Sequence, residues 1–112
     1  MPKTIEPAPT KRTILPQRRP SENLAFEHEG VPTVGTFSRD ANGRLVEVFL
    51  RAGKPGSAAD KVAQDSAIIL SLALQHNTPL TVIRHALQKL RDGSSAGPVG
   101  RFLDLIEGDG NG

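Results

Sequence analysis

Two strand-like segments run through a basic, glycine-rich loop directly into a long helical segment, and this order constrains the fold more than any other feature. Residues 33–38 and 45–50 are rich in β-branched and aromatic side chains, and the turn between them ends in Asn42-Gly43, which suits a hairpin. The loop 53–57 then contains a lysine, a proline and two of the chain's glycines. A chain of this order places the start of a helix beside the end of an antiparallel strand pair.

An earlier segment completes a small sheet. Residues 24–29 alternate apolar and polar side chains, which predicts a half-buried strand. Together with 33–38 and 45–50 it forms an antiparallel meander. Because the third of these segments carries apolar groups on both faces, we expect it to be an inner strand. The predicted fold class is α+β, a three-stranded antiparallel meander packed against two to three C-terminal helices.

Helical signals fill the second half of the chain. Ser57 is a suitable N-cap for a helix over 58–75, a second helix is predicted from Thr78-Pro79 to Gly93, and a third starts at Gly97-Pro98. The first helix is apolar nearly all round, and its expected buried stripe comprises Val62, Ser66, Ile69, Leu70 and Ala73. We therefore expect it to lie between the sheet and another helix or a partner chain, including a second copy in a homodimer.

Composition excludes several classes of protein. The 112 residues include no cysteine, so disulfide scaffolds, thiolate zinc sites and cysteine nucleophiles are excluded. The three histidines lack metal-ligand spacing, and no apolar run is long enough to span a membrane. We expect a cytoplasmic protein with no metal, no cofactor and no catalytic residue of its own, although its status as an enzyme stays open.

The charge lies unevenly along the chain. Residues 1–19 carry five basic groups against one acidic group, whereas the remainder carries nine basic and eleven acidic groups. Residues 1–20 also contain five prolines, which predicts a flexible basic arm, followed by a folded domain over 21–107 and a disordered tail over 108–112. A nucleic-acid partner would use this arm, but the acidic body and the absence of interleaved aromatics make that partner the weaker expectation.

The loop before the first helix is the leading candidate for a binding site. Lys54, Gly56 and Ser57 combine a cation with free backbone N–H groups at a helix N-terminus, which is a favourable place for an anion. The spacing is not that of a phosphate-binding P-loop. The simpler interpretation is an ordinary turn capped by Ser57, with Lys54 in solvent.

Three further charged residues belong to the candidate set. Glu47 lies between valines in the third strand and needs a partner if it is buried. It would then hold a ligand or form a structural ion pair. Arg18-Arg19 could clamp a phosphate or a partner's carboxylate, or could be part of a solvated linker.

The order of several residues resembles the TSCPD domain. The match covers roughly residues 24–90, and it is carried by Gly35, Gly43-Arg44, Glu47, Phe49, Lys54, Gly56-Ser57, the run from Ser71 to His76, and Pro79-Leu80. Domains of this family occur near the C-terminus of adenosylcobalamin-dependent ribonucleotide reductases and in small free-standing proteins. The resemblance therefore implies a link to deoxyribonucleotide metabolism. The Thr-Ser-Cys-Pro-Asp motif for which the family is named is missing here.

The leading functional hypothesis is a free-standing accessory module, non-catalytic alone, that binds a protein partner, its own copy, or an anionic nucleotide or phosphate. One alternative is a detached subunit of a ribonucleotide reductase that needs a catalytic chain, because this chain has no cysteine for the radical chemistry. The other is a nucleic-acid-binding protein that uses the basic arm.

Overall fold

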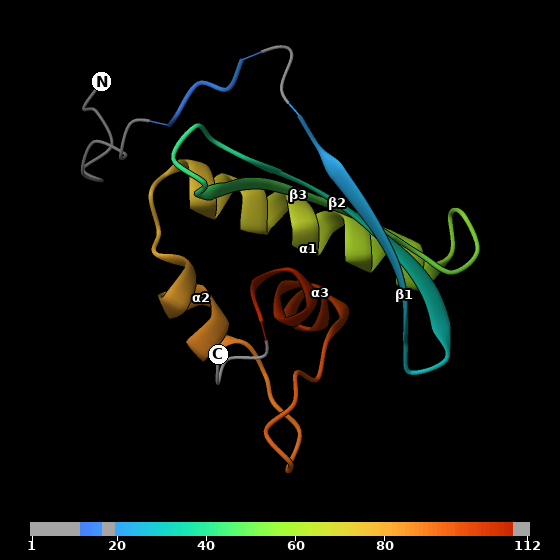
Figure 1. Ribbon diagram of the computed structural model, residues 1–112. Coiled ribbons are helices and arrows are strands. Elements are labelled where there is room, and N and C mark those ends of the chain that lie inside the picture. Colours follow the sequence, from blue (N-terminus) through green and yellow to red (C-terminus); the bar gives the residue numbers. More distant parts are fainter. Residues whose placement is uncertain (1–11, 17–19, 109–112) are drawn as a thin grey trace, which may run out of the picture.

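The computed structural model describes residues 12–16 and 20–108. Three strands come first along the chain and three helices follow; they are β1 (Glu22–His28), β2 (Val31–Arg39), β3 (Leu45–Ala52), α1 (Ala58–Gln75), α2 (Leu80–Ala86) and α3 (Pro98–Glu107). The strands form one antiparallel sheet in the order β1-β2-β3 (Figure 1). This confirms the predicted α+β fold with a three-stranded meander.

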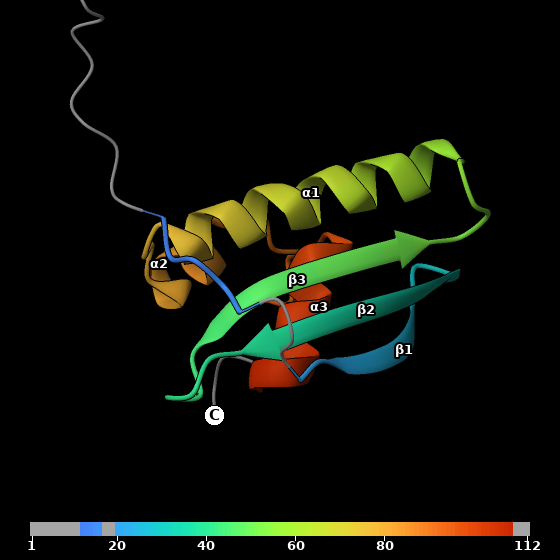
Figure 2. The same cartoon turned by 90° about the horizontal axis from the view of Figure 1, so that it is seen from above.

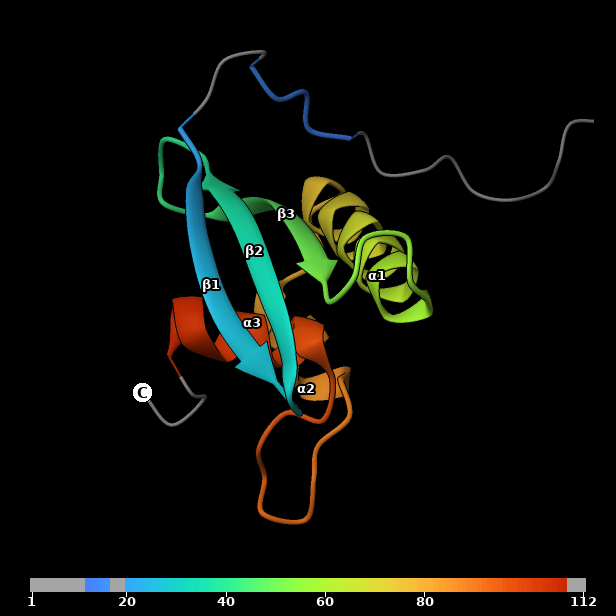
Figure 3. The ribbon, with the colours of Figure 1, turned by 90° about the vertical axis from the view of Figure 1, so that its right-hand side faces the viewer.

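The third strand is at the edge of the sheet, so the prediction of an inner position was wrong. β2 is the central strand, and it pairs with β1 on one side and with β3 on the other. In Figures 2 and 3, α1 runs alongside the outer edge of β3, whereas α3 crosses one face of the sheet. Phe49 on the second face of β3 stays exposed, so apolar side chains on both faces did not indicate an inner strand here.

Polar side chains of α1 satisfy the backbone groups along this edge. The hydroxyl of Ser71 accepts a hydrogen bond from the Val48 N–H and donates one to the Val48 carbonyl, both at 2.8 Å. The amide Nε2 of Gln75 donates to the Val46 carbonyl at 3.0 Å. Because an exposed strand edge invites pairing with other chains, this helix protects the sheet as well as covering the core.

The buried face of α1 differs from the predicted stripe. Leu70 is buried, but Val62 and Ile69 are exposed, and Ser66 and Ala73 are half-buried. The core side consists of Leu70 together with Ala63, Ala67 and Leu74. An apolar pattern that continues round the whole helix does not indicate which side packs, and the side that meets β3 is marked here by polar residues.

Phe102 of α3 is the centre of the core. Its ring stacks on Phe26 and meets Phe37 edge-on, with ring centroids 5.8 Å apart in both pairs. The ring also lies against the backbone of Gly35, where an added Cβ would come within 2.1 Å of it. Gly35 is thus needed for the close approach of α3 to the sheet.

The second helix is shorter than predicted. α2 ends at Ala86, and the chain then forms a hairpin-like loop in which Lys89 and Ser95 make an isolated antiparallel bridge. The Leu90 N–H donates to the Ser94 carbonyl within this loop. The Asp92-Gly93-Ser94 turn reverses the chain before α3, so the apolar spacing that extended to Leu90 did not indicate further helix.

Part of the predicted arm contacts the domain. The side chain of Arg12 donates to Gln75 Oε1 at 2.6 Å, and the Thr13 N–H donates to the Gln75 carbonyl at 2.8 Å. Residues 1–11, 17–19 and 109–112 lie outside the described residues, so the flexible arm and the disordered tail stay predictions.

Candidate functional site

The loop before α1 is organised around the carboxylate of Asp60. Its two oxygens accept hydrogen bonds from the Arg51 guanidinium at 3.0 and 2.8 Å and from the N–H groups of Ala52 and Gly56 at 3.0 Å each. Gln64 Nε2 adds a fifth bond at 3.0 Å. Asp60 is only 1% exposed, and it joins the end of β3, the loop and the first two turns of α1.

These donors strongly favour the charged form of Asp60. The hydrogen bonds from Arg51, Gly56 and Ala52 hold the pKa of this carboxyl well below its usual range, in spite of the desolvation that opposes them. The Asp60 N–H in turn donates to Ser57 Oγ at 3.2 Å, so Ser57 caps the helix as predicted. Of the groups that the sequence offered to an anion, the Gly56 N–H is thus already bonded to the protein's own carboxylate.

The structure brings together three of the six predicted site residues. Gly56 donates to Asp60, Ser57 caps α1, and Lys54 is exposed beside them. Glu47 is half-buried on β3, several residues before the strand reaches this loop. Arg18 and Arg19 lie outside the described residues.

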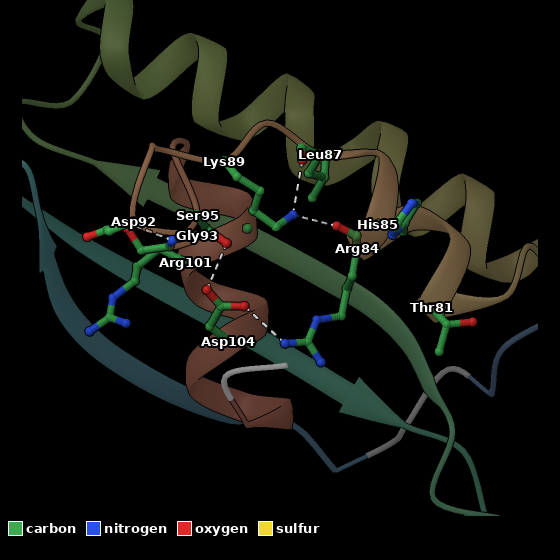
Figure 4. A pocket seen from close by; sticks show the side chains of 12 residues that line it. Thr81, Arg84, His85, Leu87, Lys89, Asp92, Gly93, Ser95, Arg101 and Asp104 are labelled. Carbon is green, nitrogen blue, oxygen red and sulfur yellow. Dashed lines mark hydrogen bonds and ion pairs between the residues drawn. The ribbon is translucent and has the colours of Figure 1, made fainter. Parts of the chain in front are cut away.

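A second region, which the sequence did not single out, contains a cavity of about 700 Å³. It lies between α2, the loop 88–96 and α3, as the close view in Figure 4 shows. Its lining includes three permanent cations against two carboxylates, and it consists of Thr81, Arg84, His85, Leu87, Lys89, Asp92, Gly93, Ser94, Ser95, Gly100, Arg101 and Asp104.

Asp104 organises one wall of this cavity. Its carboxylate accepts hydrogen bonds from Arg84 at 3.0 Å and from the buried Ser95 hydroxyl at 2.7 Å, and both side chains point at it in Figure 4. A Cβ added at Gly100 would lie 2.8 Å from the Ser95 oxygen, so a larger residue there would disturb this contact. The wall is therefore a fixed polar surface that links α2 to α3.

The other cations of the cavity are held differently. Lys89 Nζ donates to the carbonyls of Arg84 and Leu87 at the end of α2, at 2.7 and 3.0 Å, and so caps that helix. Arg101 is exposed, and its guanidinium makes no hydrogen bond or ion pair with the described part of the chain. The guanidinium of Arg101 thus keeps its N–H donors available to a ligand.

The remaining acid of the cavity is engaged locally. Asp92 accepts hydrogen bonds from the hydroxyl and the N–H of Ser94 at 2.6 and 2.9 Å, and these bonds lower the pKa of its carboxyl. The sequence contained one indication of this region: an Asp-Gly-Ser run is typical of a turn rather than of a helix interior, so it could have predicted the end of α2 before residue 92.

Comparison with known proteins identifies the family. The family model of the TSCPD domain matches residues 12–106. The chain belongs to the TSCPD domain family. The match includes the described arm residues that bond to Gln75, and it includes the whole cavity lining. No curated protein and no solved structure matches the chain.

The described residues contain neither a group of metal ligands nor a membrane-spanning helix. Residues 12–16 and 20–108 contain no cluster of three or more potential metal ligands. The same residues include no helix with the length and apolar character needed to cross a bilayer.

Proposed function

We propose that this TSCPD protein is an accessory binding module, without catalysis of its own, that binds a phosphate-bearing ligand such as a nucleotide in the cavity between α2 and α3. The observation that carries the proposal is the lining itself, in which Arg84, Lys89 and Arg101 surround a space of about 700 Å³. Guanidinium and ammonium groups are the side chains that recognise phosphate oxygens.

The bonding within the cavity supports binding rather than chemistry. The Ser95 hydroxyl donates to Asp104, and Asp104 is in turn paired with Arg84, so both oxygens of this carboxylate already have a partner within the protein. The hydrogen bonds of the cavity pair no serine with a histidine base. The exposed guanidinium of Arg101 is the group of the lining that we assign to the ligand.

Binding is tested by thermal shift with dATP, other nucleoside triphosphates and inorganic phosphate, in the parent chain and two variants. Arg101→Ala removes a cation of the cavity, and Lys54→Ala removes an equally exposed cation of the loop before α1. A ligand at 100 times its Kd stabilises a protein by about 2.7 kcal/mol, which gives a readable shift. Removal of one charge-assisted hydrogen bond weakens binding by about tenfold or more.

We expect a nucleotide-dependent shift that falls in Arg101→Ala and persists in Lys54→Ala. A shift that is lost in Lys54→Ala and persists in Arg101→Ala would instead place the binding site at Lys54, Gly56 and Ser57. A shift with phosphate alone, equal to that with dATP, would identify an anion site that does not recognise the nucleoside. No shift with any of these compounds would contradict the proposal.

Family membership favours one second function, that of a detached subunit working with a ribonucleotide reductase. Domains of this family adjoin such enzymes, and a cysteine-free chain would need a separate catalytic chain. Co-elution with a purified reductase on size exclusion tests this role. The nucleic-acid alternative depends on the basic arm, most of which lies outside the described residues, and it predicts binding to a DNA duplex that falls steeply with salt.

A further inference from the structure

The outward side of α1 carries large apolar side chains that contact no other part of the described chain extensively. Val62 is 62% exposed and Ile69 is 68% exposed, and Leu72 and Ile68 are also exposed. The opposite side of the helix bonds to β3 and packs on the core, so its orientation is fixed. In Figure 3, α1 lies beyond β3 at the margin of the molecule, where a second molecule has access to it.

The central part of this outward stripe is symmetric in spacing about one point, although Ile68 has no exposed counterpart there. Counted from the midpoint between Asp65 and Ser66, Val62 and Ile69 are equally distant, and so are two pairs of smaller or apolar residues, Ala58 with Ala73 and Ala59 with Leu72. A two-fold axis through that midpoint runs the two helices antiparallel. It places Val62 of each copy opposite Ile69 of the other copy, so the same pair occurs twice in the dimer.

We propose that α1 is the contact surface of an antiparallel two-fold homodimer, with the axis between Asp65 and Ser66. Such an interface uses the same patch on both copies, and a symmetric stripe is self-complementary by construction. The alanines near both ends of the stripe permit close approach of the two helices.

The charges beside the stripe fit a second copy better than a lipid surface. Lys61 and Asp65 are exposed one turn apart on the same side, and they carry opposite charges. In two copies the Asp65 carboxylates adjoin at the axis, where they repel each other, and the Lys61 ammonium group one turn away on each helix offsets that repulsion. A membrane-binding helix would instead show a polar face rich in Lys and Arg.

The size of the surface sets the expected affinity. A helix of 18 residues is about 27 Å long, so the contact lies at the small end of specific interfaces. We therefore expect dissociation in the micromolar range. The stripe shares no residue with the cavity between α2 and α3, so this proposal stands or falls separately from the binding proposal.

Sedimentation equilibrium of the full chain over a wide concentration range measures the association. Val62→Lys places one cation from each copy in the apolar interface and should abolish the dimer. Val82→Lys is the matched control, because Val82 is a valine on α2 with 57% exposure outside the stripe. Circular dichroism establishes that both variants fold. A monomer at all concentrations, or a dimer that Val62→Lys leaves intact, would overturn the proposal.

Cysteine cross-linking tests the geometry, and the absence of native cysteine removes any background. Next to the axis, Asp65→Cys brings two Cα atoms to a separation on the order of 6 Å, within the range for a disulfide. Ala58→Cys separates them by about 22 Å along the helices. Under mild oxidation we expect a covalent dimer from the first variant alone. Equal cross-linking of both would indicate parallel helices, and cross-linking of neither would overturn the proposed axis.

Discussion

At the scale of single residues, Asp60 determines how the loop and the first helix begin. One carboxylate accepts five hydrogen bonds from β3, the loop and α1. The positive φ of Gly53 and Gly56, +63° and +79°, lets the backbone curl around it. Two of the residues that the sequence offered as an anion site, Gly56 and Ser57, thus bond to Asp60 of the same chain.

The carboxylate of Asp60 predicts a dependence of stability on pH. Because its pKa is lowered in the folded state, it contributes stability that is fully present above the unfolded pKa of about 4, and this contribution is lost as the pH falls toward the folded value. Thermal unfolding measured between pH 6 and pH 2 should show a falling Tm for the parent chain. In Asp60→Asn the Tm at pH 6 should be lower by about 5 °C or more, and below pH 5 the Tm of this variant should depend less on pH. Parallel curves for the two proteins would contradict this account.

The contact between Gly35 and Phe102 gives a second prediction at this scale. Gly35→Ala introduces a methyl group 2.1 Å from the ring, so the close approach of α3 is lost and we expect destabilisation by about 2–3 kcal/mol in urea unfolding. Gly97→Ala is the control, because nothing lies within 4 Å of its added methyl group and its φ of −106° is unstrained. Equal effects of the two substitutions would contradict the packing argument.

At the scale of elements, α1 provides hydrogen-bond partners along the outer edge of β3, where a fourth strand could otherwise pair. Ser71 bonds to both backbone groups of Val48, and Gln75 bonds to Val46, so the helix satisfies groups that strands usually satisfy. Gln75 also receives two bonds from the arm, which links three segments that are distant in sequence.

Removal of the Ser71 hydroxyl tests this edge contact. Ser71→Ala leaves the N–H and carbonyl of Val48 buried without their partner, which should cost about 1–3 kcal/mol of unfolding free energy. Ser66→Ala is matched, since the Ser66 hydroxyl bonds only to the Val62 carbonyl of its own helix, and its change should be within about 0.5 kcal/mol. Unfolding in urea measures both, and a neutral Ser71→Ala would show that water replaces the hydroxyl.

The sequence predicts those features of the elements that depend on neighbouring residues along the chain. The hairpin, the Ser57 cap and the span 58–75 follow from turn and capping residues, and the structure confirms them. The position of β3 and the buried side of α1 depend on long-range contacts; the first prediction was wrong, and the second was confirmed at Leu70 but wrong at Val62 and Ile69. The end of α2 was misplaced because apolar spacing continued into a turn that Asp92 and Ser94 stabilise.

At the scale of the whole molecule, the two proposed binding surfaces lie on different parts of the fold. The cavity between α2 and α3 contains the cations, and the outward stripe of α1 carries the exposed apolar side chains. The sequence did not indicate the cavity as a site because its lining comes from three segments whose contact depends on the turn at Gly93. A dimer formed through α1 would leave both of its cavities open.

The measurement that tests the central claim most directly is an NMR titration of the uniformly labelled protein with dATP, with amide shifts followed residue by residue. Binding in the cavity predicts saturable shifts of Ser94, Ser95, Gly100 and Arg101, with the amides of residues 53–57 unchanged. Shifts confined to residues 53–57, or none at millimolar dATP, would contradict the proposed site.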